Sequence, residues 1–498
     1  MKSPPGKNLS RRNFIKTTAF AAAGTTIIPS FHRFSFKPAL MTRSFGRLNH
    51  RVTTFGLGGQ ASIQWTPPDV DPVAIIMKAF ARGVNYFDTS NLYGPSQSNY
   101  NKAFRILGLI PGNAGYNESL RRSFFLTSKT HLRFAKGGWQ ADGLDNWTNG
   151  KQGTHTVDDL KRSLSLLFGD GNGNYPEGAY LDMILIHSVT NTVEVNAVYE
   201  GLYNTDSKAE HIGALAALRD YRDGTNLTGL NPKEEKLVRH IGFSGHYNAS
   251  VMMDMIRRDK DDILDGLLVA VNSNDKLNFN MQYNVIPVAS AKNMGIIGMK
   301  VFADGAMYSK GAHWSGQPSD VVRQVGSKEL PFRPLIQYTL TTPGISTAII
   351  GIGQISDDPT KCQLTQNIEA SQIGNKGLSE NDRTDVEKLT RHVKEGKTNY
   401  FQNDKGGLTA PNDIQAKQFE TNKVKLTWNT AYAGDNPINF YELSRNGSKV
   451  AQVPHKPQVT EIPFEYIDVV ENMQRPEYRI VTIDKKGNRV ESESIRVV

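Results

Sequence analysis

Residues 85–94 read NYFDTSNLYG: an apolar run ends at Asp88, and Tyr93 follows five residues later. Three further stretches have the same form, FFLTSKT at 124–130 with Lys129, LDMILIHS at 181–188 with His187, and HIGFSGH at 240–246 with Ser244. Each stretch places a polar side chain where a short buried strand should end. Because parallel strands of a barrel end at one face, these side chains are expected to share one mouth.

Apolar runs of strand length recur along the chain, and helix-length periodic segments separate them. The eight runs span 54–57, 84–87, 124–126, 183–186, 241–243, 267–271, 296–299 and 347–350. The alternation of eight strands with helices predicts an α/β fold, a (β/α)8 TIM barrel of ordinary length.

The polar residues at the strand ends suit carbonyl chemistry. A phenol has a pKa near ~10 and is a poor acid at neutral pH, whereas a neighbouring ammonium lowers that pKa. Tyr93 beside Lys129 would form such a pair, and Asp88 would supply the counter-charge that keeps the buried ammonium in place. An imidazole from His187 could orient a carbonyl oxygen. Any one of these residues alone would more often be a packing residue, so their joint order carries the prediction.

These four residues occur in the order seen in the aldo-keto reductases, and the chain resembles this family over residues 39–398. The resemblance begins with MTRSFGRLNHRVTTFGLGG at 41–59, which is similar to the family's opening hairpin and first strand. It implies that Tyr93 is the general acid, with Lys129 and Asp88 tuning its pKa. It also implies that His187 orients the substrate and that a nicotinamide supplies the hydride. No metal site is expected.

The nicotinamide contacts depart from the family's usual pattern. Most members carry Ser-Asn at the end of the fifth strand, whereas this chain has Ser244-Gly245. Asn272 stands where the family usually has Gln and offers the same amide groups on a shorter side chain. Met299, followed by Lys300, replaces an aromatic that often stacks on the nicotinamide, and methionine can pack on a ring face. All of these residues are expected to contact the cofactor. Gln282-Tyr283-Asn284 is expected to be structural, because it lies where a helix should begin.

Glycine-containing loops after the seventh and eighth strands are expected to hold the dinucleotide phosphates. Gly305 follows the seventh strand, and Gly351 and Gly353 follow the eighth, where they leave room for backbone amides to approach phosphate. Gln366-Asn367 matches the family's adenine contact by position. Members that bind the 2′-phosphate of NADP usually carry Lys or Arg after the eighth strand. No cation occurs here between Gly351 and Lys361, so the choice between NADP and NAD stays open.

The N-terminus predicts export by the twin-arginine route. SRRNFIK at 10–16 is a twin-arginine signature, and the stretch 17–31 that follows is mildly apolar and uncharged. This stretch is shorter than the ~20 residues that a membrane-spanning helix needs. Residues 1–37, the predicted signal peptide, hold seven cations and no acidic residue, so most of the net charge of +9 lies there. We therefore expect a periplasmic or extracellular protein that uses the twin-arginine export machinery and binds no nucleic acid.

A boundary is expected where periodicity is lost, in GKTNYFQNDKGGLTAPND at 396–413. The predicted parts are a barrel over 38–398, a linker over 399–410 and a second domain over 411–498. The second domain alternates like strands joined by turns, and Trp428 and Tyr478 are expected in its core. It resembles a fibronectin type III β-sandwich, which implies a spacer, a lid beside the mouth, or a contact with carbohydrate or protein.

Two long insertions follow Lys129 and His187, on the expected catalytic side of the barrel. Their aromatic residues could stack on a sugar or aromatic substrate, or could pack the loops against themselves. These residues are Trp139, Trp147, His155, Tyr199 and Tyr203.

Three functions remain open at this stage. The first is an exported reductase or dehydrogenase that acts on an aldehyde, ketone or sugar with NADP or NAD. The second is a nucleotide-binding sensor or scaffold without turnover. The third is a redox-neutral enzyme, such as an epimerase, that retains its cofactor; retention would suit an enzyme outside the cytoplasm, where free nicotinamide nucleotide is scarce. The presence of all four mouth residues favours an enzyme.

Overall fold

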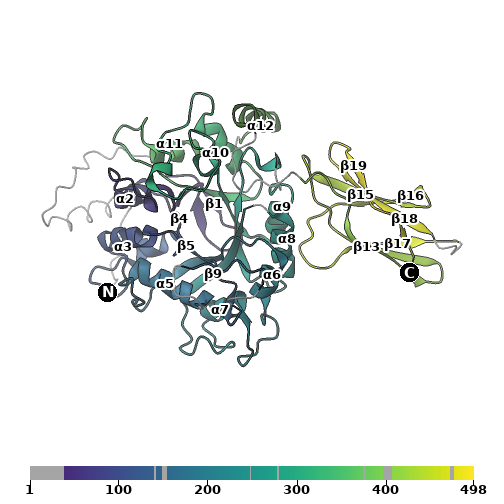
Figure 1. The fold of residues 1–498 in the computed structure, drawn as a ribbon, viewed down its shortest axis with the longest axis horizontal. Coiled ribbons are helices and arrows are strands. Elements are labelled where there is room, and N and C mark those ends of the chain that lie inside the picture. The colour runs from purple at the N-terminus through teal and green to yellow at the C-terminus, as the bar shows by residue number, and fades with distance from the viewer. Residues whose placement is uncertain are drawn as a thin grey trace, which may run out of the picture.

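The computed structural model of the chain describes residues 39–138, 142–148, 154–246, 248–277, 280–373, 377–395, 406–471 and 476–497. The predicted signal peptide therefore lies outside the described residues, as do Trp139 and the first part of the predicted linker. Figure 1 shows two parts, a large barrel surrounded by helices and a smaller all-β part attached to one side.

Eight parallel strands form a closed barrel and follow one another around it in chain order. They are β3 (Phe55–Gly58), β4 (Tyr86–Asp88), β5 (Phe125–Thr130), β7 (Leu181–Ile186), β9 (Val238–Gly245), β10 (Leu264–Ala270), β11 (Gly295–Met299) and β12 (Ile345–Ile350). The last strand, β12, pairs with β3 and closes the barrel. Each predicted apolar run overlaps one of these strands, which confirms the predicted barrel.

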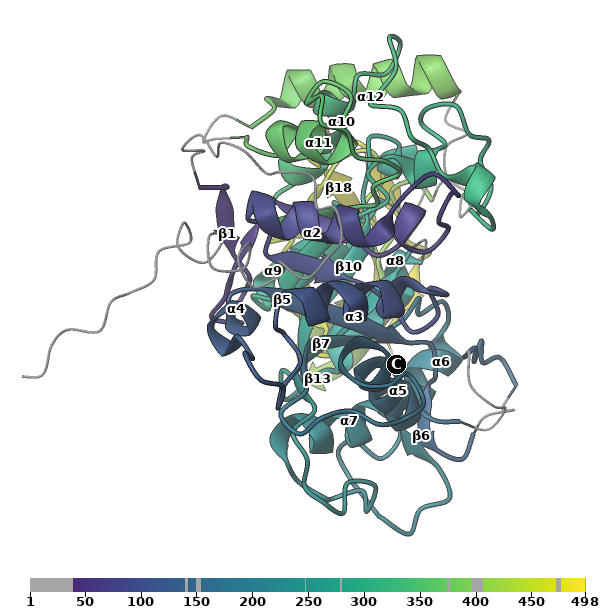
Figure 2. The ribbon, with the colours of Figure 1, turned by 90° about the vertical axis from the view of Figure 1, so that its left-hand side faces the viewer.

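Helices surround the strands, as Figure 2 shows from the side. They are α2 (Pro72–Arg82), α3 (Ser96–Ile106), α4 (Glu118–Arg122), α5 (Thr156–Phe168), α6 (Thr192–Tyr199), α7 (Ala214–Asp223), α8 (Ala249–Arg258), α9 (Val285–Ala291), α10 (Phe332–Leu340), α11 (Gln363–Ala370) and α12 (Glu380–Lys394). Because helices cover one face of each strand and the barrel interior covers the other, strands such as Leu181–Ile186 are buried along their whole length.

A short antiparallel hairpin, β1 (Thr42–Ser44) and β2 (Arg51–Thr53), covers the end of the barrel where the strands begin. Phe45 in its turn packs edge-on against Tyr86 and Phe125, with ring centroids 5.6 and 5.1 Å apart. Tyr86 and Phe125 are the first residues of β4 and β5. The hairpin thus fills the amino ends of the strands and leaves the carboxyl ends for a site.

The two predicted insertions lie side by side at the carboxyl ends. A strand from the first, β6 (Phe134–Lys136), pairs antiparallel with β8 (Ile212–Gly213) at the end of the second. Together they build one wall beside the mouth.

The C-terminal part consists of two antiparallel sheets. One has the order β13-β14-β17, and the other has the order β16-β15-β18-β19, with β20 also paired to β18. Their strands are β13 (Asn412–Glu420), β14 (Lys423–Asn429), β15 (Ile438–Arg445), β16 (Ser448–Pro454), β17 (Phe464–Val469), β18 (Glu477–Asp484), β19 (Arg489–Glu491) and β20 (Ile495–Arg496). Trp428 and Tyr478 are fully buried between other core residues, as predicted. An all-β second domain is therefore confirmed.

The C-terminal part is docked on the barrel next to α8 and α9, on the side away from α2 and α3 (Figure 1). Asn284, at the start of α9, accepts a hydrogen bond from the Ala433 amide (2.8 Å) and donates one to the Ala433 carbonyl (3.1 Å). Asn280 donates to the carbonyl of Gly434. Tyr283 packs against the C-terminal core, and Tyr432 packs against the barrel. The structural role expected for residues 282–284 is thus a joint between the two parts.

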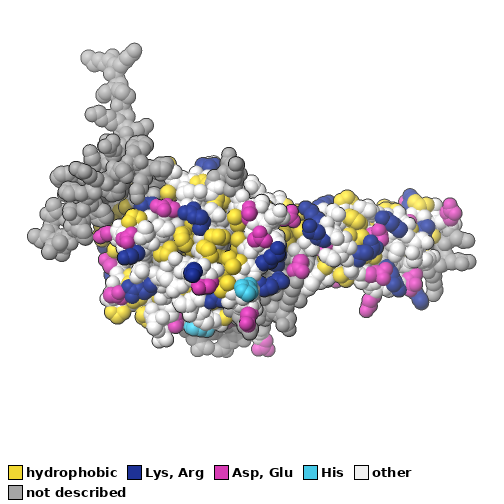
Figure 3. All heavy atoms as spheres, turned by 90° about the horizontal axis from the view of Figure 1, so that it is seen from above, with side chains coloured by type: hydrophobic (Ala, Val, Ile, Leu, Met, Phe, Trp, Pro, Cys, Tyr) yellow, Lys and Arg dark blue, Asp and Glu magenta, His cyan; other side chains and the backbone are white. Residues whose placement is uncertain are grey.

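Charged side chains of both signs are interspersed on the face shown in Figure 3, around patches of hydrophobic side chains. Within the described ranges, no helix is both long and apolar enough to cross a membrane.

Candidate active site

The four predicted catalytic residues come from three neighbouring strands and meet at their carboxyl ends. Asp88 is the last residue of β4, and Tyr93 lies in the turn that follows. Lys129 is the second-last residue of β5, and His187 comes directly after β7. The barrel order β4-β5-β7 makes these strands adjacent, so one wall of the mouth carries all four side chains.

Lys129 and Asp88 form a buried ion pair. The Lys129 Nζ donates to Asp88 Oδ1 at 2.5 Å and to the Thr89 carbonyl at 2.9 Å. Burial lowers the pKa of Lys129, and the attraction of Asp88 opposes that effect. Burial raises the pKa of Asp88, and Lys129 opposes this in turn. Each charge therefore depends on the other for its presence in the interior.

Tyr93 lies with its ring 4.7 Å from the Lys129 Nζ and 6.1 Å from the ring of His187. Its side chain is buried and lines the cleft at the mouth. Burial, followed by the charges of Asp88 and Asp304, raises the pKa of Tyr93 well above its usual value. In the free protein, burial therefore dominates the pKa of Tyr93, and Asp88 already neutralises the nearby Lys129 ammonium.

His187 is buried, and its pKa is lowered well below the usual value by burial and then by the electrostatic effect of neighbouring groups, including His131 and Lys129. The imidazole is therefore neutral. Among the described residues, its buried Nδ1 has no hydrogen-bond partner. A neutral ring at this position can present a donor to an uncharged carbonyl oxygen.

A long cleft leads from these residues across the ends of β11 and β12. Its lining includes Asp88, Tyr93 and His187 at one end and Gln363 and Asn367 at the other. The predicted cofactor residues that line it are Met299, Lys300, Gly305, Gly351 and Asn367. Those that do not line it are Ser244, Gly245, Asn272, Gly353 and Gln366. The described residues of the C-terminal part contribute nothing to this lining.

The structure gives these outlying residues other contacts. Ser244 Oγ accepts a hydrogen bond from the Ser188 amide at 2.9 Å. A Cβ at Gly245 would lie 2.3 Å from Met252 Sδ, so this glycine permits close packing of α8. The Asn272 amide donates to the Lys300 carbonyl at 3.1 Å and accepts from the Asn274 amide at 2.9 Å.

Near the far end, the Gly353 amide donates to Gln363 Oε1 at 2.7 Å. Gln366 donates to the Pro359 carbonyl at 2.8 Å and is not turned into the cleft. Gln363, which is not among the predicted site residues, thus holds the loop after β12 while lining the cleft. A glutamine at the start of a helix carries no sequence signal for such a role.

Two further cleft residues were missed in the sequence. His246 follows Ser244-Gly245 and lines the cleft, and its pKa is lowered well below the usual value by burial and by Lys300. Trp314 also lines it, with the Lys300 Nζ 4.7 Å from its ring. Lys300 has a left-handed backbone, with φ 58°, which turns the chain sharply at the end of β11. The position of His246 directly after a predicted contact was the only available hint.

Residues 321–326 cross the far half of the cleft, and all of them except Arg323 line it. A Cβ at Gly353 would lie 2.3 Å from the Val322 carbonyl oxygen, which shows how closely this segment approaches the loop after β12. Arg323 donates to Gln354 Oε1 at 3.2 Å and forms an ion pair with Asp69 at 2.6 Å. A cation therefore stands beside the loop after β12, although the sequence of that loop contains none before Lys361.

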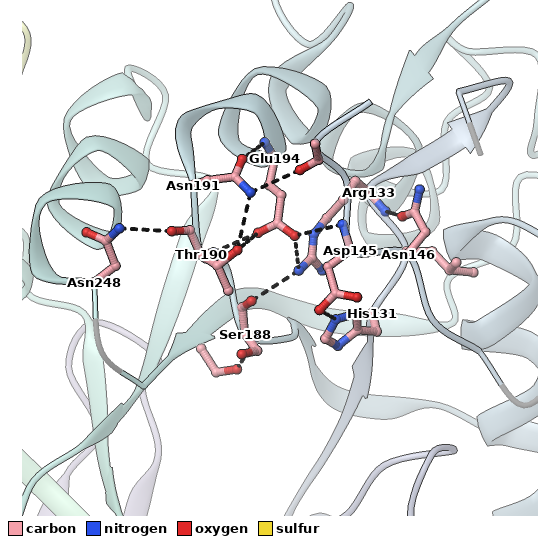
Figure 4. Close-up of polar contacts among 12 residues, drawn as sticks. His131, Arg133, Asp145, Asn146, Ser188, Thr190, Asn191, Glu194 and Asn248 are labelled. Atoms are coloured by element: carbon pink, nitrogen blue, oxygen red, sulfur yellow. Dashed lines mark hydrogen bonds and ion pairs between the residues drawn. The ribbon is translucent and has the colours of Figure 1, made fainter. Parts of the chain in front are cut away.

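A buried polar network supports the two insertions beside the same wall of the mouth (Figure 4). Arg133 and Glu194, both fully buried, form an ion pair at 3.1 Å. Glu194 also accepts from the Thr190 amide at 2.7 Å and from the Asp145 amide at 3.3 Å. Arg133 donates to the Ser188 carbonyl at 3.1 Å. The network ties the segment after β5 to the segment after β7.

The sequence matches the model of the aldo/keto reductase family over residues 54–377. Two solved structures from Pseudomonas aeruginosa, provisionally described as aldo-keto reductases, are similar to the chain. The first is 20% identical, with a TM-score of 0.40, and the match covers 67% of this chain and 95% of the other. The second is 19% identical, with a TM-score of 0.39 and coverage of 66% and 95%. A comparison with curated proteins finds no match.

Proposed function

Since the chain belongs to the aldo/keto reductase family, we propose that it is an exported oxidoreductase that exchanges hydride between a nicotinamide cofactor and an aldehyde, ketone or sugar, with Tyr93 as proton donor. The observation that carries this proposal is the Lys129 ammonium, which is bonded to Asp88 at 2.5 Å and lies 4.7 Å from the Tyr93 ring in the wall of the cleft.

Each residue of the wall has a separate task. The hydride would come from a nicotinamide held in the cleft. His187, neutral at physiological pH, donates a hydrogen bond that orients the carbonyl oxygen. The Tyr93 hydroxyl gives its proton to that oxygen as negative charge develops there. Lys129 stabilises the negative charge left on the phenol oxygen, and Asp88 and the Thr89 carbonyl keep the ammonium in place.

The cleft suits a dinucleotide. Met299 offers an apolar surface beside Tyr93 and His187, where the reacting ring would lie. Gly305 and Gly351 expose backbone without side chains further along, and Asn367 offers an amide at the far end. Arg323 lies beside the lining of the cleft, where it contacts Gln354 and Asp69. It would supply the cation for a 2′-phosphate, which favours NADP over NAD. Its position on the crossing segment also supports slow cofactor release, as an exported enzyme would need.

Tyr93→Phe tests the proposal. It should reduce carbonyl turnover on the order of 10²-fold or more, because it removes only the proton donor. Cofactor affinity, measured by quenching of tryptophan fluorescence, should stay within about twofold of wild type, because the substitution removes only an uncharged hydroxyl group. Tyr203→Phe, which alters an exposed tyrosine elsewhere, serves as the control.

Three results would redirect the proposal. Equal turnover in Tyr93→Phe and wild type would remove Tyr93 from the chemistry. Wild-type protein that binds nucleotide tightly but turns over no carbonyl compound or alcohol would instead favour the sensor. A bound cofactor that changes oxidation state and regains its starting oxidation state within one turnover would favour the redox-neutral enzyme.

A further inference from the structure

Trp147 is a large aromatic side chain that stays exposed, at 56%, beside the mouth. Its ring lies 6.3 Å from the ring of His131, which lies 5.3 Å from that of His187. The ring of His187 is in turn 6.1 Å from that of Tyr93. Four rings thus form a continuous row from solvent to the proposed proton donor.

The other aromatic candidates of the two insertions have structural contacts. Tyr199 donates to the Met255 carbonyl at 2.5 Å, and Tyr203 donates to the Arg258 carbonyl at 2.8 Å, so both hold the end of α8. His155 caps the start of α5. Among the described aromatic residues of this set, Trp147 alone neither holds the end of α8 nor caps α5.

The two residues before Trp147 are held by hydrogen bonds to buried residues of the barrel. The Asp145 amide donates to the buried Glu194 at 3.3 Å, and Asn146 Oδ1 accepts from the Arg133 amide at 3.0 Å. Figure 4 shows both contacts within the network around Arg133 and Glu194.

The residue after Trp147 is fixed as well. Thr148 Oγ1 donates to Asp159 Oδ1 at 2.9 Å and accepts from Arg162 at 2.7 Å. Anchors on both sides hold the backbone at Trp147 in place, so the ring is presented to solvent on a rigid support. Such a ring needs little ordering when a ligand covers it.

A second observation points to a ligand with hydroxyl groups. His131 is more than nine-tenths buried, and its Nε2 is 3.3 Å from Asp145 Oδ2, a carboxylate that can only accept. Burial lowers the pKa of His131, so the ring is neutral and its other nitrogen is an acceptor. That nitrogen, Nδ1, is buried and has no hydrogen-bond partner in the described part of the chain. A buried acceptor without a donor is unfavourable until a ligand supplies one.

We propose that Trp147 and His131 form a subsite for a sugar ring, whose C–H face stacks on the indole while a ring hydroxyl donates to His131 Nδ1. A pyranose combines an apolar face with hydroxyl donors at its edge, and both features are needed here. An aromatic aldehyde would cover the indole but leave the His131 acceptor without a donor. The proposal rests on the proposed function, because the row of rings would deliver the sugar to His187 and Tyr93.

The test compares sugars with carbonyl compounds that lack a sugar ring, using the full chain. Wild type should turn over at least one member of a panel of aldoses and aldonolactones as well as butanal. In Trp147→Ala, the ratio of kcat/KM for the sugar to that for butanal should fall at least tenfold, through KM. Trp147→Phe should restore most of the ratio, because a flat ring remains. Leu227→Ala, an exposed apolar side chain on the opposite end of the barrel, should leave the ratio unchanged.

His131→Phe separates the hydroxyl contact from the stacking. The substitution should lower the ratio of kcat/KM for the unmodified sugar to that for butanal. In a series of monodeoxy sugars, the one that lacks the hydroxyl bound by His131 should give the same ratio in wild type and in the variant. The proposal is overturned, and the subsite is aromatic, if kcat/KM for 4-nitrobenzaldehyde exceeds that for every sugar and falls in Trp147→Ala by as large a factor as that for any sugar. Turnover of butanal without any sugar also overturns it while leaving the proposed function intact.

If wild type turns over nothing, the proposed function fails and the subsite is judged by binding alone. Calorimetric titration with the sugar panel should then give heat with wild type and none with Trp147→Ala. Absence of binding to wild type overturns the subsite as well.

Discussion

The ion pair between Asp88 and Lys129 is the residue-scale feature on which the site depends most. Both side chains are almost completely buried, and their 2.5 Å contact and the Thr89 carbonyl compensate for taking two charges out of water. Removing one partner would leave the other as a lone charge in the interior. The pair therefore has measurable consequences for both stability and catalysis.

Asp88→Asn should lower the free energy of unfolding by roughly 3–5 kcal/mol, the usual loss when one member of a buried ion pair is removed. Lys129 would lose the attraction that opposes the effect of burial on its pKa, so it would deprotonate more readily and support Tyr93 less. Urea unfolding and steady-state turnover check both effects.

The double variant Asp88→Asn with Lys129→Met provides the matched control. It should recover part of the lost stability, because no charge is left unpaired, but none of the activity. A double variant as unstable as the single one would contradict the ion-pair argument.

The pH profile of carbonyl reduction gives a second residue-scale prediction. The pKa of Tyr93 is raised above its ordinary 10.0, so the proton donor stays protonated as pH rises through 7 to 10. The pKa of His187 is lowered below its ordinary 6.5, so its ring stays neutral down to at least that pH. We expect kcat/KM for reduction to be flat between these limits. A loss of activity between pH 7 and 9 would mean that the free-protein pKa of Tyr93 does not govern the step.

At the scale of elements, the eight strands were predictable because each is a short apolar run that the fold buries on both faces. The positions of Asp88, Lys129 and His187 in the site were predictable because these residues lie at strand ends. The crossing segment at 321–326 was not predictable. It has no periodicity, and its contacts with Gln354 and Asp69 join residues more than thirty positions apart in the chain. The same holds for Trp147, whose exposure depends on anchors from three other segments.

The crossing segment leads to a prediction about cofactor release. Arg323→Gln should speed dissociation of the nucleotide about two- to fivefold, because the exposed ion pair with Asp69 is worth only ~0.2–1 kcal/mol. Stopped-flow fluorescence of the pre-loaded protein measures this rate.

Asp69→Asn separates two roles of Arg323. It removes the ion pair but keeps the cation, so it should speed release without changing the preference for NADP over NAD. Arg323→Gln should reduce that preference as well. Equal effects of the two variants on the preference would mean that Arg323 acts only as a latch.

For the whole molecule, the joint between the two parts decides whether they unfold together. Asn284 pairs with both backbone groups of Ala433, and Asn280 bonds to Gly434, in a region that Tyr283 and Tyr432 shield. Asn284→Ala should separate one calorimetric transition into two, because it leaves buried backbone groups of the C-terminal part without partners. Lys417→Ala on the exposed side of β13 should not.

A chain that ends at Gly407 should still fold and bind nucleotide, because the barrel has its own core and all described residues of the cleft belong to it. It should be less stable than the full chain, since Tyr283 and Asn284 would become exposed. Insolubility of the shortened protein would show that the two parts form one cooperative unit.

The location of the molecule is predicted from its N-terminus. Arg11→Lys with Arg12→Lys should retain the protein in the cytoplasm, because the twin-arginine signature depends on the paired guanidinium groups. Cell fractionation measures the effect, and undiminished export of the double variant would point to another route.

The joint also bears on how freely the appended domain can diverge. Asn280 and Asn284 recognise the peptide groups of Ala433 and Gly434, which every amino acid except proline possesses in full, so the shape of the turn matters more than its side chains. The two small residues keep that turn close to α9. A foreign sandwich that carries the same small turn should therefore be graftable onto this barrel, and the barrel could acquire new outer surfaces without any change in its chemistry.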